Sequence, residues 1–293
     1  MRTLLIRLPI LVLFVVALRA DTAPAPTEGT YKDIKRNFGF VPTFMKAVPD
    51  EALPGAWDEM SALEMSTDTA LPARTKELIG LAVSAQIPCR YCVYADTQFA
   101  RAAGATDREL HEAIAMAAVT RHWSTVLNGM QVDPAAFEKE MATVFGYLAK
   151  APRPTTNEPI TDAESAYKDI ERTLGSVPTF YKLFPQVAIA AAWREQKGFE
   201  LNPTTALPNK TKELIGLAVA AQIPCRYCVT FHTQAAKLDG ASDAEIQEAV
   251  AMSALTRHWS TILNGTLQDE NQFRHEVDQA LKNPRKPPAQ AQR

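Results

Sequence analysis

Two cysteines and a histidine form the most reactive cluster of side chains in the second half of the chain. Cys225, Cys228 and His232 follow Pro224, a natural first residue of a helix because its missing N–H would have no partner there. A helix that begins near Pro224 places the three side chains at i, i+3 and i+7, on one face. The spacing predicts two thiols that can close a disulfide, with an imidazole one turn beyond Cys228 to exchange a proton with it.

The position of each group on its helix bears on its expected role. Cys225 falls in the first turn, where the positive end of the helix dipole favours a thiolate. Glu213 lies twelve residues before Cys225, on what reads as the preceding helix. If the two helices pack together, the carboxylate of Glu213 can orient His232 or accept its proton. The other interpretation of Glu213 is a solvated charge or a surface ion pair, because glutamate is mostly exposed in proteins.

The cysteine pattern occurs twice. Cys89 and Cys92 precede the second pair by 136 residues, and the offset holds without insertion or deletion. Leu71–Gly129 and Leu207–Gly265 are identical at 41 of 59 positions. The chain is therefore a tandem duplication of one domain, with copy one before copy two. Two copies are too few for a solenoid, so we expect two similar all-α domains packed about a pseudo-two-fold axis.

The two copies differ at the histidine. Asp96 stands in copy one where copy two has His232, whereas Glu77, Cys89 and Cys92 match Glu213, Cys225 and Cys228. A carboxylate beside a thiol opposes thiolate formation, because like charges disfavour each other. We therefore expect copy one to be less active or to use a different proton relay.

Two other interpretations of the C-x-x-C pairs are inert core cysteines and a zinc site. Cysteine is often a buried residue without chemistry, but two pairs at this spacing, each after a proline, favour redox or metal chemistry. Zinc needs four ligands, and His232 and Glu213 could complete a set only in copy two. We predict a redox dithiol with neither a metal nor a cofactor.

Composition predicts a helical protein of about two domains. The 293 residues are 46% hydrophobic, and the net charge of −2 gives no basic field for nucleic acid. Copy one is predicted to form a helix that opens at Tyr31 and ends before Pro42, followed by helices over 49–64, 75–86, 88–103, 106–127 and 133–150. Thr106-Asp-Arg-Glu109 and Ser242-Asp-Ala-Glu245 are capping boxes, and Asn128-Gly129 is a C-terminal stop.

A second repeated motif, Thr-Arg-His-Trp-Ser-Thr, lies late in the long helix of each copy. Its histidines, His122 and His258, could reach the active cavity. We favour packing of the His-Trp pair at a domain or subunit interface. Tyr91 and Tyr227, between the cysteines, are interpreted as caps over the site.

The N-terminus has the features of a secretory signal peptide over residues 1–20. A basic flank precedes an apolar run from Leu8 to Leu18, which is too short for the about 20 residues that a membrane span needs. The alternatives are an uncleaved anchor or a mis-assigned start codon. Export would place the mature protein, secreted or periplasmic and off the membrane, in an oxidising compartment. The domains are assigned to 21–150 and 161–282, with a flexible leader at 21–29, a linker at 151–160 and a disordered tail at 283–293.

The pattern Glu-x11-Cys-x2-Cys-x3-His inside an all-helical repeat resembles the alkyl hydroperoxide reductase D / carboxymuconolactone decarboxylase superfamily. Each copy has about the length of one such domain. The resemblance implies that Glu213 and His232 relay protons onto the cysteines, that Cys228 is the peroxidatic thiol and that Cys225 resolves it. The helix dipole instead favours Cys225 as the thiol of lower pKa. We follow the resemblance for the roles.

The resemblance also implies a reaction and its partners. The expected activity is a thiol-dependent peroxidase that acts on a hydroperoxide and is restored by an external dithiol or a thioredoxin-like reductant, in a homo-oligomer. A general thiol–disulfide oxidoreductase and a non-enzymatic zinc-binding or structural module are the alternatives. Lactone decarboxylation is a weak interpretation, because the decarboxylase branch lacks the paired cysteines.

Overall fold

The computed structural model describes residues 27–150 and 158–283, and every regular element in these two ranges is helical. The predicted signal peptide, residues 151–157 of the linker and residues 284–293 of the tail lie outside the described residues. Among the helices that are described, none combines the length and the apolar character of a membrane span. The all-α fold class is confirmed for the described part of the chain.

The two copies form matching series of helices. Copy one contains α1 (Thr27–Phe38), the 3-10 turn η1 (Thr43–Ala47), α2 (Leu53–Leu63), α3 (Ala73–Gln86), α4 (Arg90–Ala102), α5 (Asp107–Gly129) and α6 (Pro134–Leu148). Copy two contains α7 (Ala163–Leu174), α8 (Thr179–Leu183), α9 (Gln186–Glu195), the π-helical turn η2 (Gln196–Glu200), α10 (Asn209–Gln222), α11 (Arg226–Leu238), α12 (Asp243–Gly265) and α13 (Glu270–Lys282).

Both predicted capping boxes are present and fix the starts of the long helices. The Thr106 hydroxyl accepts the N–H of Glu109, whose carboxylate accepts the N–H of Thr106, and Ser242 and Glu245 do the same at α12. The predicted stop at Asn128-Gly129 is wrong in detail. The helix continues through Gly129, and the left-handed residue that turns the chain is Gln131, at φ 51°.

The N-terminal segment also differs from its prediction. α1 begins at Thr27, four residues before Tyr31, so residues 27–29 of the predicted flexible leader are helical. Burial of Ile34 and Phe38 against the rest of copy one holds this helix in place, and Trp57 donates its Nε1–H to Asp33. The helix ends before Pro42, as predicted.

Four helices form the centre of the molecule. α3 and α10, the helices that carry Glu77 and Glu213, contact each other, and both pack against α5 and α12. Their residues are buried on nearly every side, from Thr75 to Ser84 and from Lys212 to Ala220. The candidate carboxylates therefore belong to the most enclosed elements of the fold.

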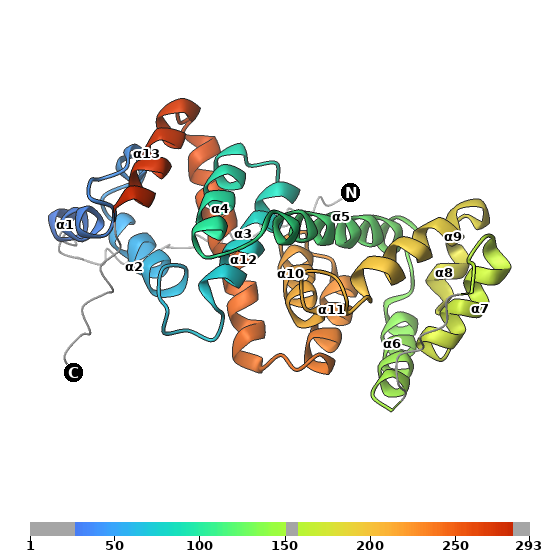
Figure 1. Cartoon of the computed structure of the whole chain (residues 1–293). Coiled ribbons are helices and arrows are strands. Elements are labelled where there is room, and N and C mark those ends of the chain that lie inside the picture. The colour runs from blue at the N-terminus through green and yellow to red at the C-terminus, as the bar shows by residue number, and fades with distance from the viewer. Residues whose placement is uncertain (1–26, 151–157, 284–293) are drawn as a thin grey trace, which may run out of the picture.

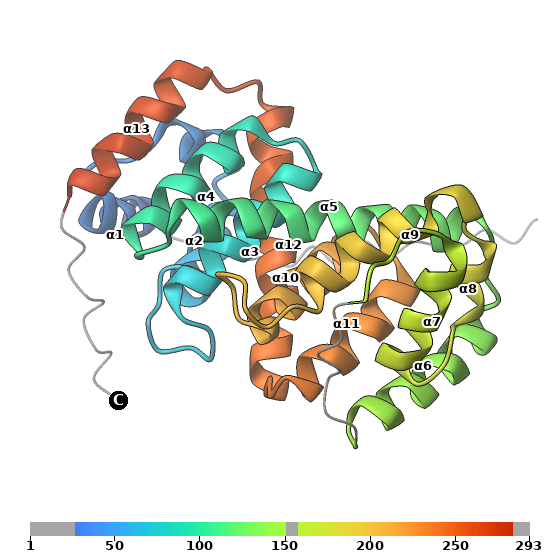
Figure 2. The same ribbon diagram turned by 45° about the vertical axis from the view of Figure 1, so that its right-hand side comes forward.

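The end of each copy packs on the other copy. α6 contacts α7 and α11, whereas α13 contacts α1 and α4. Figures 1 and 2 show this exchange, with red α13 beside blue α1 and green α6 beside yellow-green α7. α5 leaves copy one and runs along α10 and α11 of copy two. The pseudo-two-fold pair is therefore present, and each half is completed by helices of the other copy.

Two glutamates tie the copies together at matching places. The carboxylate of Glu112, on α5, accepts the N–H groups of Ala206 and Leu207 at 2.9 and 2.8 Å. Glu248, on α12, accepts the N–H groups of Ala70 and Leu71 in the same way. Each long helix thus fixes the loop that leads into the central helix of the opposite copy.

Candidate active site

The cysteine helix of each copy begins one residue after the first cysteine. Cys225 is the N-cap of α11 in an extended conformation, and its Sγ accepts the N–H of Cys228 at 3.3 Å. Cys89 caps α4 in the same way. The prediction that Pro224 starts the helix is wrong, because the N–H of Cys225 bonds to the carbonyl of Ala220 and turns the chain before the helix begins. Cys225 still lies at the positive end of the helix dipole.

Both cysteine pairs are joined as disulfides, so the structure describes the oxidised protein. The bonds link Cys89 to Cys92 and Cys225 to Cys228. All four residues are buried. The C-x-x-C spacing therefore does what the sequence predicts, which is to bring two sulfurs together across the first turn of a helix.

His232 and Glu213 form a buried pair. The Nδ1 of His232 lies 2.8 Å from Oε2 of Glu213, and the two residues are only 3% and 2% exposed. The interpretation of Glu213 as a solvated charge is therefore wrong, and Glu77, its counterpart in copy one, is also buried, at 4% exposed. The imidazole lies directly on α10 because residue 216 is glycine: a Cβ there would be 2.5 Å from Cε1 of His232.

The other ring nitrogen of His232 faces copy one. Oγ1 of Thr120, on α5, lies 3.3 Å from Nε2 of His232. An ionised Glu213 can only accept a hydrogen bond, so Nδ1 carries the hydrogen and Nε2 keeps its lone pair. Nε2 is then the basic atom, and Thr120 can donate its hydroxyl hydrogen to it. The sequence did not identify Thr120, because the residue belongs to the other copy.

Glu200 is a second carboxyl at the imidazole, and no motif in the sequence indicates it. Its Oε1 lies 3.8 Å from Nδ1 of His232, and its Oε2 is buried without a hydrogen-bond partner. Burial, together with the nearby charge of Glu213, raises the pKa of Glu200 to about 7. Burial also lowers the pKa of His232. Both shifts favour neutral side chains at this point.

A small cavity lies in front of these groups. It has a volume of about 30 Å³ and is bordered by Cys228, His232, Glu200 and Thr120. Its remaining walls are mainly apolar and include Trp123, Phe137, Phe180, Tyr227 and Phe231. Since one water needs roughly 10–15 Å³ measured in this way, the space admits about two small oxygen atoms. Cys228, rather than Cys225, is the sulfur at this cavity.

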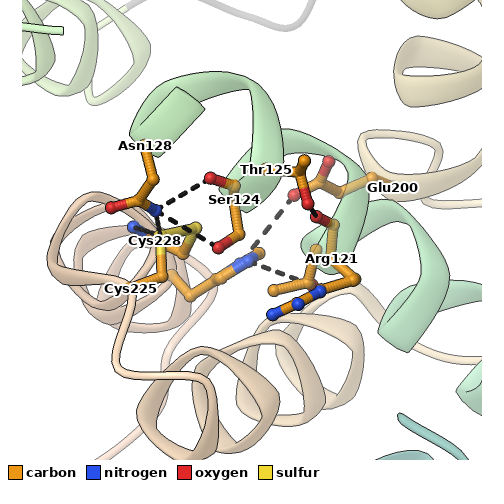
Figure 3. Close-up of a disulfide and its surroundings, with 9 residues drawn as sticks. Arg121, Ser124, Thr125, Asn128, Glu200, Cys225 and Cys228 are labelled. Atoms are coloured by element: carbon orange, nitrogen blue, oxygen red, sulfur yellow. Dashed lines mark hydrogen bonds and ion pairs between the residues drawn. A yellow bond between two sulfur atoms is a disulfide. The ribbon is translucent and has the colours of Figure 1, made fainter. Parts of the chain in front are cut away.

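Cys225 faces a different side of the site. The Nδ2 of Asn128, an exposed residue of α5, lies 3.5 Å from its Sγ and also bonds to Ser124. Figure 3 shows Asn128 over the cysteine pair, together with Ser124 and Glu200. The two sulfurs are therefore approached from different directions, Cys228 from the cavity and Cys225 from under Asn128.

The tyrosines between the cysteines do more than cap the site. The Tyr227 hydroxyl donates to the carbonyl of Val132 at 2.6 Å, and Tyr91 donates to Gln268 at the same distance. Each tyrosine thereby binds the loop after the long helix of the opposite copy.

The repeated His-Trp motif packs between the copies, as we favoured. His122 contacts the rings of Trp123 and Phe184, and Trp123 packs on Phe180 and Tyr181 of copy two. The cavity is bordered by Trp123 and not by His122.

Copy one has the same arrangement without an imidazole. Asp96, Glu77 and Glu64 place carboxylate oxygens within 4.8 Å of one another, in the same way as Glu200, Glu213 and a ring nitrogen of His232 lie together in copy two. Oδ2 of Asp96 is buried without a hydrogen-bond partner, and burial, followed by the charge of Glu64, raises its pKa well above the ordinary value. Either cluster has the donor atoms to hold a cation.

Comparison with known proteins identifies the family. A model of the carboxymuconolactone decarboxylase family matches residues 51–133 and 187–267, which is more than half of the chain. An uncharacterized protein of the cox locus of Paracoccus denitrificans is 38% identical over 52 residues, and the match spans 18% of this chain and 47% of that protein.

A solved structure shares the fold. A putative gamma-carboxymuconolactone decarboxylase subunit from Burkholderia xenovorans superposes with a TM-score of 0.58 at 18% identity, over 84% of this chain and 96% of its own. At that identity the likeness concerns the fold alone. With both halves matched separately by the family model, the chain belongs to the carboxymuconolactone decarboxylase family, as a tandem member that carries two copies of the domain.

Proposed function

We propose that copy two is a thiol-dependent peroxidase. In the reduced protein, Nε2 of His232 takes the proton of the Cys228 thiol, while Glu213 holds the imidazole through Nδ1. The Cys228 thiolate attacks one oxygen of a hydroperoxide in the cavity. The S–O bond forms, the O–O bond breaks, and the leaving oxygen takes up a proton to give an alcohol or water.

The second half of the cycle uses Cys225. Its thiol attacks the Cys228 sulfenic acid, so that the disulfide forms and water leaves. An external dithiol, such as a thioredoxin-like protein, then returns two electrons and two protons. The exposed Asn128 lies next to the Cys225 sulfur, so we place the approach of the reductant on that side.

The buried cavity at Cys228 is the observation that carries this proposal. An imidazole held by a carboxylate, a sulfur and a space of about 30 Å³ meet there. Cys228, the sulfur at the cavity, is 4% exposed, so a small peroxide can reach it there but a protein disulfide cannot. Exchange with a protein, which the reductant also needs, has to take place at Cys225 on the side of Asn128. The small cavity therefore favours a peroxide over a protein disulfide as the oxidising substrate. We keep the oxidoreductase as the second candidate, because Asn128 marks a route to the disulfide.

The role of copy one follows from its own cluster. Without an imidazole, Cys92 has no base comparable to His232, because burial raises the pKa of Asp96 and favours its acid form. We propose that Glu77, Cys89 and Cys92 contribute little to peroxide turnover. We also retain as proposals the export of the mature protein and its assembly into a homo-oligomer.

Substitution of single cysteines tests the function. With the mature chain and several dithiol donors, Cys228→Ser should reduce peroxide consumption to background, because the attacking sulfur is gone. Cys89→Ser should leave most of the activity. Equal activity of the two variants would refute the assignment. Metal analysis of the reduced protein separates the zinc-binding alternative, which requires about one zinc per C-x-x-C pair.

A further inference from the structure

We propose that Glu200 is the general acid that gives its proton to the oxygen leaving the peroxide when Cys228 attacks. This inference rests on the proposed peroxidase function and adds a second carboxyl to it. The relay through Glu213 and His232 removes a proton from the thiol. This relay does not provide the proton that the leaving oxygen of the peroxide needs.

The geometry places Glu200 at that other end. Glu200 borders the cavity together with Cys228 and His232, whereas Glu213 lies behind the imidazole. Glu200 is 2% exposed, and its Oε2 has no hydrogen-bond partner. A buried polar atom without a partner is costly unless a ligand or water satisfies it. A peroxide in the cavity supplies that partner.

The backbone holds Glu200 in this place. Glu200 ends the π-helical turn η2, and turns of this kind occur frequently at functional sites. The buried Lys212 donates to the carbonyls of Phe199 and Asn202, at 2.8 and 2.6 Å, on either side of the segment. The carboxyl is therefore positioned by the main chain and not by a flexible surface loop.

The surroundings of Glu200 keep its proton available near neutrality. The titratable and polar groups that face it are Glu213 and Lys212 from α10, His232 from α11, Tyr181 from α8, Gln196 from η2 and Thr120 from α5. Burial and the charge of Glu213 raise its pKa to about 7, against the smaller opposing effects of His232, Gln196 and Lys212. A general acid works best with a pKa near the operating pH.

The step balances with Glu200 as the donor. The thiolate of Cys228 bonds to one peroxide oxygen and the O–O electron pair leaves with the other oxygen. That oxygen takes the proton of Glu200, so the products are the sulfenic acid, an alcohol or water, and a glutamate anion. The proton that His232 received on Nε2 then returns the carboxylate to its acid form through the product water or alcohol in the cavity, which both side chains border.

The test compares two peroxides whose leaving groups differ. Hydrogen peroxide expels a hydroxide that needs a proton, whereas peracetic acid expels acetate, which leaves as a stable anion. Reduced full-length protein is mixed with one equivalent of either oxidant, and the Cys225/Cys228 peptide is followed by quenching, alkylation and mass spectrometry. We expect Glu200→Gln to slow the reaction with hydrogen peroxide about 100-fold, the lower range for a lost general acid, and to change the peracetic acid rate less than about threefold.

The pH profile supplies a second readout. The wild-type rate with hydrogen peroxide should fall as pH rises above about 7, where Glu200 loses its proton, and the fall should be missing in Glu200→Gln. Glu195→Gln, which removes an exposed carboxylate five residues earlier, is the matched control and should behave as wild type.

Each result has one meaning. Equal losses on both oxidants, with an unchanged pH profile, would show a structural role of Glu200 and overturn this inference alone. A wild-type protein that oxidises Cys228 with neither oxidant would overturn the peroxidase proposal and this inference with it. A selective loss on hydrogen peroxide, in a variant whose thermal unfolding matches that of the control, supports Glu200 as the acid.

Discussion

Three titratable side chains lie together in the interior of copy two. His232 lies between Glu213 and Glu200, at 2.8 and 3.8 Å, and none of the three has appreciable contact with solvent. Burial lowers the pKa of the imidazole and raises that of Glu200, so the pair favours an uncharged state over an ion pair. A neutral imidazole is the form that can take a proton from a thiol. Burial of this cluster costs desolvation free energy, and the same desolvation keeps His232 in the neutral form that acts as a base.

The opposite shifts predict how stability depends on pH. Unfolding releases a proton from Glu200 between pH 4.5 and about 7, and takes up one at His232 below 6.5, so the two contributions oppose each other. In His232→Gln only the Glu200 contribution remains. Because its folded-state pKa is raised, that contribution is fully present below pH 4.5 and is lost as pH rises to about 7. Relative to wild type, the variant should lose up to roughly 1.4 kcal/mol per pH unit in this window.

Urea unfolding at several pH values between 5 and 7 measures this difference. His111→Gln, at an exposed position of α5, serves as the control and should follow the wild-type profile. A His232→Gln profile parallel to that of wild type would show that His232 does not bind its proton more weakly in the folded protein than in the unfolded one.

The crossing of two helices decides which side chain the site can hold. α10 and α11 meet at Gly216, and the ring of His232 lies against this glycine. α3 and α4 meet in the same way at Gly80, where an added Cβ would lie 3.1 Å from the carboxyl carbon of Asp96. Copy one has thus kept the glycine that an imidazole requires. It has also kept Thr256, which borders its cavity at the place that corresponds to Thr120.

Because copy one has the matching glycine and threonine, we predict that it can gain function. In a Cys228→Ser background, Asp96→His should restore peroxide consumption, now through Cys92, because the new imidazole would meet Glu77 and Glu64 as His232 meets their counterparts. The measurement is the rate with a small dithiol donor. The triple change with Gly80→Ala should abolish the gain, since a Cβ at 80 would occupy the space of the ring. A restored rate in both backgrounds would contradict the steric argument.

Exchange of helices determines how the whole molecule is built. α5 brings Thr120, Trp123 and Asn128 to the site of copy two, and α12 brings Thr256 and Trp259 to copy one. Neither site is complete within its own copy. Each long helix therefore contributes its side chains to the site of the opposite copy.

Separate expression of copy two tests this dependence. Residues 158–283 alone lack α5 and α6, and we expect them to form a homodimer in which α12 and α13 of the second molecule take those places. α12 offers Thr256, Trp259 and Asn264 at the equivalent positions. Light scattering measures the mass of the assembly and a peroxide assay its activity. A monomer with full activity would show that the exchanged helices are dispensable.

The sequence predicted the parts of the site that follow from local spacing. Cys225, Cys228 and His232 share one helix, and Glu213 precedes them on the next, so periodicity was enough to bring them together. The repeat and the capping boxes were equally visible. The oxidised pairs and the buried imidazole–carboxylate contact confirm this level of inference.

The remaining features depend on contacts that no local pattern records. Glu200 reaches the cavity through a π-helical turn that carries no motif, and Thr120 comes from the other copy. The sequence shows that two domains are alike, but the same apolar faces would permit α6 to pack on its own copy. The cysteine helix starts later than the sequence predicts, and a sulfur, in place of an oxygen, caps it.

Fusing two copies into one polypeptide has a consequence for how the sites can diverge. When two identical subunits form a pair of symmetric sites, every substitution in the gene changes both sites. Here each site is encoded by its own codons. The aspartate in copy one and the histidine in copy two show that the two sites already differ. A single substitution can inactivate one site or change its activity, while the helices around that site continue to contribute residues to the other site.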